Sequence, residues 1–231
     1  MKTIGMLGGM SWESTASYYR AINQGIKSQL GDLHSAKICM RSVDFNELEQ
    51  LQHQGNWEEI ASILANEAHL IERGGADFLI MCTNTMHKVA PQIEAAISIP
   101  MLHIADATAA KLTLDNIKTV GLIGTKFTMT EEFFSSRLQT EFGIDVIVPN
   151  QEQQDLLHRV IYEELCLGRI NDDSRTRYLE IITQLYEQGA EAVVLGCTEI
   201  ALLVHPDQTH VPLYDTTILH ASEAVRTALA K

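Results

Sequence analysis

Two short segments of the chain end in side chains that could do chemistry. GADFLIMCTNT spans residues 75–85 and GAEAVVLGCTE spans residues 189–199. In each, a glycine, an alanine and an acidic residue precede an apolar run typical of a buried strand. Small polar residues follow the run: Thr83, Asn84 and Thr85 in the first segment, and Cys197, Thr198 and Glu199 in the second. The pattern predicts two strands that carry functional groups at their carboxyl ends.

The alignment of the two segments decides which side chains correspond. When their first glycines are matched without gaps, Thr83 stands opposite Cys197, whereas a shift of one residue pairs Cys82 with Cys197. Side chains alternate between the two faces of a strand, so Cys82 and Thr83 are expected to point in opposite directions. Only one of the two can therefore occupy the position that corresponds to Cys197.

Cys197 is the strongest candidate for a reactive group. It follows a predicted strand and precedes a predicted helix, whose positive N-terminal end would favour the thiolate form of the side chain. A thiolate can act as a base or as a nucleophile. The alternative is a small buried residue with no chemical role, since free cysteines are often buried. The polar neighbours at a strand end favour the chemical role.

Other polar residues near the predicted strand ends could bind the substrate. Asn84, Thr85 and Thr198 offer amide and hydroxyl groups suited to a carboxylate, although the same residue types also cap helices. The turn after the first strand contains Met10, and the matching turn of the second half contains Thr125 and Thr128, which could contact an anion or cap a helix. Gln52 lies in a polar stretch, 46–56, that could form a short helix or a lid.

Charged side chains and histidines are weaker candidates. Arg41 and Arg169 could pair with an acidic substrate, or could be ordinary surface charges. His87 follows Thr83 by four residues and could flank the site, but a lone histidine in an apolar helix is more often a core residue. His205 and His210 match no metal-binding spacing, so no metal site is expected.

The surrounding elements repeat. TIGMLGG starts at position 3 and TVGLIGT at 119, which are 116 apart, while the two polar-ended segments start 114 apart. Strands and helices alternate in both halves, which predicts parallel α/β sheets with ligands beyond the carboxyl ends of the strands. We expect two duplicated α/β halves that face each other across a cleft. Residues 1–100 with the helix 216–231 form the first half, and 101–215 form the second.

Composition narrows the class of protein. The 231 residues include 17 basic and 30 acidic side chains, for a net charge of -13, which argues against nucleic acid or an anionic membrane as a partner. The N-terminal apolar stretch is too short for a secretory signal or a membrane span. Four cysteines without a CxxC motif are typical of a reducing compartment. We therefore expect a cytoplasmic protein that acts on a small molecule.

These features together resemble the aspartate/glutamate racemase family of amino-acid racemases. The CTNT and GCTE strand ends, the opening GMLGGMSWEST and the duplication carry the resemblance, which covers essentially the whole chain. It implies two duplicated Rossmann-like domains with parallel sheets, and two cysteines on opposite faces of the substrate α-carbon. The resemblance further implies homodimers, and neither pyridoxal phosphate nor a metal as cofactor. It also implies that the strand-end Asn and Thr groups hold the α-carboxylate. We expect the substrate to contact Met10, Gln52, Asn84, Thr85, Thr125, Thr128, Arg169, Thr198 and Glu199.

The chain departs from the family pattern at Thr83, where the resemblance implies the first catalytic cysteine. Either Thr83 relays the proton and the enzyme favours L-substrates, or Cys82 reaches the site through a local backbone shift. Strand alternation favours Thr83, so we expect Thr83 and Cys197 to be the catalytic pair. The alternatives to a racemase are a single-cysteine lyase or isomerase that uses Cys197 alone, and a non-catalytic amino-acid binding protein.

Overall fold

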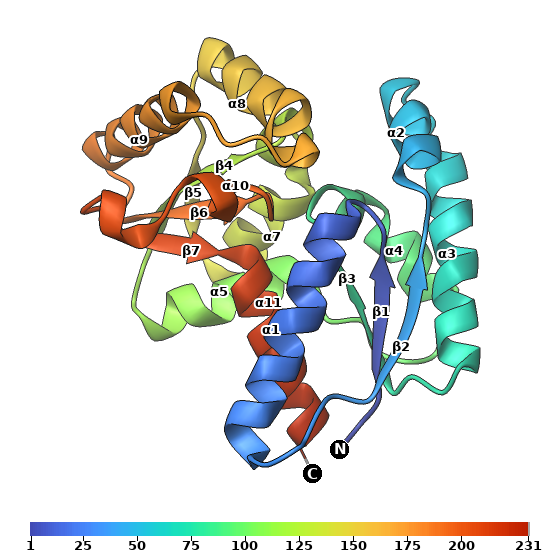
Figure 1. The fold of residues 1–231 in the computed structure, drawn as a ribbon. Coiled ribbons are helices and arrows are strands. Elements are labelled where there is room, and N and C mark those ends of the chain that lie inside the picture. Colours follow the sequence, from blue (N-terminus) through green and yellow to red (C-terminus); the bar gives the residue numbers. More distant parts are fainter. Residues whose placement is uncertain (231) are drawn as a thin grey trace. The chain divides into compact units, whose positions relative to one another are not determined.

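The computed structural model describes residues 1–230 and forms two compact α/β units (Figure 1). The first unit contains Met1–Ile104 and the chain from His220 onward, and the second contains Ala105–Leu219. Each unit has its own parallel sheet with helices packed on it. Among the described residues, no helix combines the length and the apolar character needed to cross a membrane.

The first unit is built on a parallel sheet of three strands in the order β2-β1-β3. The strands are β1 (Ile4–Gly8), β2 (Ile38–Ser42) and β3 (Phe78–Met81). Its helices are α1 (Trp12–Leu30), α2 (Phe45–His53), α3 (Trp57–Arg73), the 3-10 helix η1 (Thr85–Val89), α4 (Ala90–Ala95) and the later part of α11 (Thr216–Leu229). Every residue of β1 and β3 is buried, which explains their continuous apolar sequences.

Alternate residues of β3 enter two separate hydrophobic cores. Leu79 and Met81 pack in a core with apolar residues of α2, α3 and α4. Phe78 and Ile80 pack in the other core, which α1 and α11 complete. Cys82 follows the strand directly and lies in the same core as Phe78 and Ile80. The alternation expected from the sequence therefore continues to position 82.

The second unit is built on a parallel sheet of four strands in the order β5-β4-β6-β7. The strands are β4 (Thr119–Gly124), β5 (Asp145–Ile147), β6 (Ala192–Gly196) and β7 (Leu213–Asp215). The helices are α5 (Ile104–Leu114), α6 (Lys126–Thr130), α7 (Glu132–Phe142), α8 (Gln151–Glu163), η2 (Leu165–Leu167), α9 (Asp172–Glu187), α10 (Ile200–Leu203) and η3 (Pro206–Gln208). Apolar residues of α8, α9 and α10 pack with β6 in one core.

The strand pairings of the two units correspond residue by residue. Ile4 of β1 pairs with Phe78 of β3, and Val120 of β4 pairs with Ala192 of β6. Positions 4 and 120 are 116 apart, and positions 78 and 192 are 114 apart, which are the offsets read from the sequence. The predicted fold class, duplicated Rossmann-like units with parallel sheets, is confirmed.

The sequence pattern and the structure differ in two places. Residues 99–102 have the apolar composition of a strand, yet an isolated bridge between Leu79 and Met101 forms there instead. Asp172 and Asp173 are residue types that suit the N-cap of α9, yet the N-cap is Asn171, whose side chain accepts from the Asp173 backbone N–H. Asparagine is as good an N-cap as aspartate, so residue type alone could not separate these positions.

Candidate active site

The first set of predicted residues lies directly after β3. The backbone N–H of Cys82 donates to the Leu7 carbonyl of β1 at 2.9 Å, so the chain stays attached to the sheet up to this residue. The Ser14 hydroxyl of α1 then donates to the Cys82 carbonyl at 2.8 Å. The next carbonyl, that of Thr83, lies 2.8 Å from Nδ1 of His87. Two consecutive carbonyls are held by buried side chains, which constrains the backbone of Thr83 on both sides.

Cys82 and Thr83 have different surroundings. The Cys82 side chain is fully buried in the same core as Met6 and Ile22. This burial removes the thiolate from water and raises the pKa of the Cys82 thiol well above its ordinary value. Thr83 keeps 9% of its surface exposed. Bringing the Cys82 sulfur to the strand edge would require moving a backbone that Ser14 anchors.

The other residues predicted in the first unit are buried. Asn84 and Thr85 open η1, and no side-chain hydrogen bond caps this helix, so the capping alternative is not realised there. Met10 follows β1 and belongs to the core with α2 and α3. Gln52 lies on α2, the helix that follows β2. The first unit thus brings Met10, Thr83, Asn84 and Thr85 to the carboxyl ends of the neighbouring strands β1 and β3.

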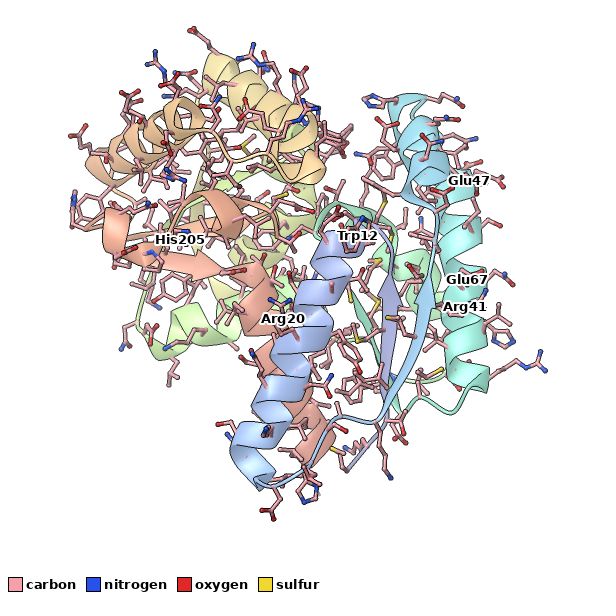
Figure 2. All side chains as sticks on the ribbon, viewed as in Figure 1. Trp12, Arg20, Arg41, Glu47, Glu67 and His205 are labelled. Atoms are coloured by element: carbon pink, nitrogen blue, oxygen red, sulfur yellow. The ribbon has the colours of Figure 1, made fainter. Side chains whose placement is uncertain are left out.

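Arg41, a predicted cationic candidate, belongs to a surface ion pair. Its Nε lies 2.5 Å from Oε2 of Glu67 on α3 (Figure 2). The hydrogen bond to this carboxylate and its negative charge raise the pKa of Arg41. The ordinary surface role, left open by the sequence, is the one observed.

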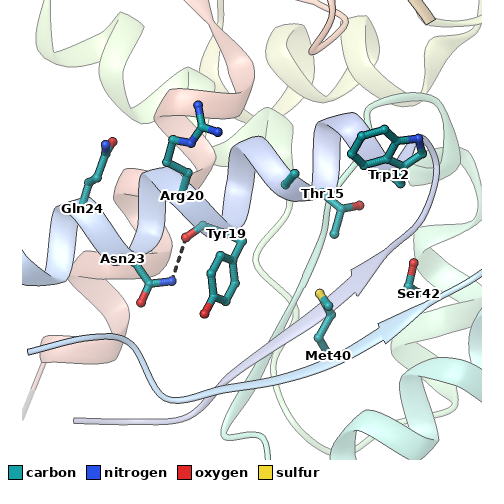
Figure 3. Close-up of a pocket in the computed structure, with 9 residues that line it drawn as sticks. Trp12, Thr15, Tyr19, Arg20, Asn23, Gln24, Met40 and Ser42 are labelled. Carbon is teal, nitrogen blue, oxygen red and sulfur yellow. Dashed lines mark hydrogen bonds between the residues drawn. The ribbon is translucent and has the colours of Figure 1, made fainter. Parts of the chain in front are cut away.

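A groove on the first unit runs between α1 and β2 (Figure 3). Trp12, Tyr19, Arg20, Asn23, Met40 and Ser42 are among the residues that line it. Trp12 is 68% exposed, and the Asn23 amide donates to the Tyr19 backbone carbonyl at 2.8 Å. None of the residues predicted to bind or transform a substrate lines this groove.

The second set of predicted residues lies directly after β6. The Cys197 thiol donates to Oε2 of Glu199 at a sulfur–oxygen distance of 3.0 Å. The Thr198 hydroxyl donates to the same oxygen at 2.6 Å. One carboxylate oxygen of Glu199 thus accepts from both Cys197 and Thr198. The three residues lie between the end of β6 and the start of α10. Cys197, Thr198 and Glu199, all predicted from the sequence, therefore form one hydrogen-bonded cluster.

The pKa of the Cys197 thiol is shifted in the direction opposite to the one expected. Burial is the largest cause and the negative charge of Glu199 the second, and together they raise the pKa of the Cys197 thiol well above its ordinary value. The sequence predicted the opposite, because it placed the sulfur at a helix N-terminus. The helix concerned, α10, has only four residues, while Glu199 stands between it and Cys197. The hydrogen bond to Glu199 and the raised pKa both favour the thiol over the thiolate.

Thr125 and Thr128 lie at the end of β4, the strand that pairs with β6. Thr125 caps α6 by accepting from the Thr128 backbone N–H at 3.3 Å, and the two hydroxyl oxygens are 3.1 Å apart. Capping therefore accounts for Thr125, and both hydroxyls still lie at the carboxyl end of a strand. Arg169 is exposed and follows η2, away from any strand end in the chain order. The second unit brings Thr125, Thr128, Cys197, Thr198 and Glu199 to the carboxyl ends of neighbouring strands, and Arg169 belongs to a different part of the chain, the segment after η2.

Sequence reasoning missed Ser14 and undervalued His87. Ser14 occupies the buried stripe of α1 that also contains Tyr18, Ile22 and Ile26. A polar residue in such a stripe needs a buried partner, and this signal could have identified it. His87 is buried as expected, and its contact with Thr83 ties it to the strand end. Within residues 1–230, no group of three or more His, Cys, Asp or Glu side chains could hold a metal ion.

Comparison with known proteins finds a matching family model and several similar chains. The family model of the Asp/Glu/hydantoin racemases matches residues 7–224. The chain is 51% identical to a Yersinia pestis protein with a provisional assignment as an Asp/Glu racemase, with full coverage of both chains and a TM-score of 0.94. It is 32% identical to an aspartate racemase homologue from Pyrococcus horikoshii, again with full coverage, at a TM-score of 0.87. The broad specificity amino-acid racemase RacX of Bacillus subtilis is 25% identical over 98% of each chain.

The chain belongs to the Asp/Glu/hydantoin racemase family, because the match extends over nearly its whole length. Relatives in this family are named as amino-acid racemases, and the chain is an amino-acid racemase, which makes it an isomerase.

Proposed function

We propose that the enzyme inverts the α-carbon of an acidic amino acid, with Cys197 and Thr83 acting on opposite faces of that carbon. The observation that carries the proposal is that β1 pairs with β3 in the same way as β4 pairs with β6, residue by corresponding residue. Thr83 and Cys197 are 114 positions apart, the same offset that relates β3 to β6. Corresponding groups at two duplicated strand ends suit a reaction in which a proton leaves one face and another arrives on the opposite face.

The proposed reaction moves protons and breaks no other bond. From the L-enantiomer, the Cys197 thiolate removes the α-proton, and the electron pair of the C–H bond stays on the substrate as a carbanion. The Thr83 hydroxyl donates a proton to the opposite face, which gives the D-enantiomer, and then regains a proton from solvent. The Cys197 thiol returns its proton to solvent before the next cycle.

The unequal pair predicts different rates for the two enantiomers. A thiol, with an ordinary pKa of about 8.5, forms its anion far more readily than an aliphatic hydroxyl does. L-substrates meet the thiol, whereas D-substrates must lose their proton to Thr83. We therefore propose that the enzyme favours L-substrates, while the overall equilibrium between the enantiomers is unchanged.

The remaining predicted residues would hold the substrate. Asn84, Thr85 and Thr198 offer donors for the α-carboxylate, and Glu199 offers a carboxylate for the α-ammonium group. The negative charge of Glu199 is one cause of the raised pKa of Cys197. The positive ammonium group of a bound substrate would offset this charge, and would therefore favour the Cys197 thiolate. We further propose substrate contacts with Met10, Gln52, Thr125, Thr128 and, through an acidic side chain, Arg169.

The proposed chemistry requires neither pyridoxal phosphate nor a metal, because a positioned thiol and hydroxyl account for both proton transfers. This independence of cofactors, a homodimeric state and a cytoplasmic location remain proposals that rest on the family resemblance.

A cysteine substitution tests the assignment. Cys197→Ser should abolish exchange of the α-proton of L-aspartate and L-glutamate with D₂O, because a hydroxyl replaces the accessible thiolate. Cys166→Ser is the matched control, because Cys166 packs against the same core as Cys197. Exchange at the parental rate in Cys197→Ser would refute the catalytic role. Net consumption of substrate would identify a lyase, and binding without any exchange in the parent protein would identify a binding protein.

A further inference from the structure

His87 is bonded through both ring nitrogens in the interior of the first unit. Its Nδ1 lies 2.8 Å from the Thr83 carbonyl oxygen, which can only accept a hydrogen bond, so Nδ1 carries the proton. The backbone N–H of Ile104 donates to Nε2 at 3.3 Å, so Nε2 is unprotonated. The two contacts together specify one neutral tautomer. The side chain is 1% exposed, which keeps these bonds out of competition with water.

The surroundings of His87 favour this neutral state. The His103 ring lies 4.5 Å away and the His220 ring 5.9 Å away, measured between ring centroids. Burial and these two neighbours lower the pKa of His87 well below its ordinary value. His220 is itself held, because its Nδ1 lies 2.9 Å from the Tyr18 hydroxyl and its Nε2 lies 2.9 Å from the Leu102 carbonyl.

The local backbone explains why a side chain serves the Thr83 carbonyl. In η1 the backbone N–H of His87 donates to the Asn84 carbonyl at 3.0 Å, as a 3-10 helix requires. An α-helical bond would instead have joined that N–H to the Thr83 carbonyl. Instead, the His87 ring donates to the Thr83 carbonyl, which lies four residues earlier in the chain. The imidazole thus links the start of η1 to the proposed catalytic residue.

We infer that His87 is a positioning residue, whose neutral imidazole holds the Thr83 main chain in place for proton transfer on the Thr83 side of the substrate. The inference rests on the proposed function of Thr83. Proton transfer is sensitive to position, and a displacement of about 1 Å can reduce a rate by about 10²-fold. Only the half of the reaction that uses Thr83 should depend on His87, because exchange of the α-proton by Cys197 does not use Thr83.

Two substitutions separate the two ring nitrogens. In His87→Asn the side-chain amide can replace the Nδ1–H donor to Thr83, whereas in His87→Gln the longer side chain can replace the Nε2 acceptor for Ile104. L-aspartate in D₂O then reports two rates: α-proton exchange with retention, which measures the Cys197 half, and inversion, which needs both halves. We expect His87→Gln to lower inversion by about 10- to 100-fold with little change in exchange with retention. His87→Asn should lie closer to the parent in both rates.

Other results would overturn the inference. These are an unchanged inversion rate in His87→Gln, an equal loss of exchange and inversion, or a larger inversion defect in His87→Asn than in His87→Gln. The ¹⁵N shifts of the His87 ring in the parent protein add a test that needs no activity: a protonated Nδ1 and a bare Nε2 support the inference, and the opposite tautomer or an imidazolium refutes it. Absence of all α-proton exchange in the parent would instead refute the proposed function, which makes the two failures distinguishable.

Discussion

Ser14 offers the sharpest test of how the Thr83 segment is held. Its side chain is 2% exposed, and its hydroxyl donates to the Cys82 carbonyl at 2.8 Å. Ser14→Ala leaves that carbonyl buried without this donor, and an orphaned buried acceptor costs about 1–3 kcal/mol. We therefore expect the free energy of unfolding to fall by about this amount relative to a suitable control.

Ser17→Ala is the matched control. Ser17 lies on the same helix, and its hydroxyl donates to the Glu13 carbonyl at 3.1 Å in an exposed position. Both substitutions change serine to alanine inside α1, so the gain in helix propensity is common to both and cancels in the comparison. The difference between the two variants isolates the buried hydrogen bond.

Scanning calorimetry and urea titration measure this difference. For a protein of this size, 1 kcal/mol shifts Tm by about 2–4 °C, so Ser14→Ala should melt about 2–12 °C below Ser17→Ala. The urea midpoint should fall while the slope stays the same, because the surface exposed on unfolding does not change. Equal melting temperatures for the two variants would refute the claim that Ser14 anchors the strand end.

Two further predictions concern the cysteines. Glu199→Gln removes a negative charge that raises the pKa of the Cys197 thiol, so the pKa should fall; in the substrate-free protein, alkylation of Cys197 by iodoacetamide, followed by mass spectrometry, should begin at a lower pH than in the parent. An unchanged or upward-shifted pH profile would contradict this cause. Cys82→Ala should cost about 1 kcal/mol of stability, roughly that of a methyl-sized buried group, and should preserve both α-proton exchange and inversion. Loss of inversion alone would show that Cys82 is the group of the first half.

The correspondence between the strands of the two units could be predicted because buried strands have a recognisable apolar pattern in the sequence. Apolar runs of similar length, each between a glycine and small polar residues, align Thr83 with Cys197 in the sequence. Strand alternation also predicted correctly that Cys82 and Thr83 would differ, since Cys82 lies in the core with Ile80. These features depend on residues close together in the chain.

The features that could not be predicted depend on residues brought together by folding. The raised pKa of Cys197 follows from burial and from the orientation of the Glu199 carboxylate, and a linear sequence contains neither. Ser14 and Cys82 are 68 positions apart, so their hydrogen bond has no local pattern. Residues around Met101 resemble a strand by composition, but they form an isolated bridge to Leu79. Composition does not determine how far such a pairing extends.

Exchange of the α-proton from each enantiomer tests the central claim most directly. The parent protein and Thr83→Cys are incubated in D₂O with L- and D-aspartate or L- and D-glutamate, and the loss of the α-proton signal is followed by NMR. If Thr83 and Cys197 are the two unequal groups, the parent should exchange L-substrates at least about 10²-fold faster than D-substrates, a difference typical of general acid–base catalysis. Thr83→Cys should raise the rate from D-substrates by supplying a second thiol. Equal rates from both enantiomers in the parent, or a Thr83→Cys variant with no gain on D-substrates, would contradict the account.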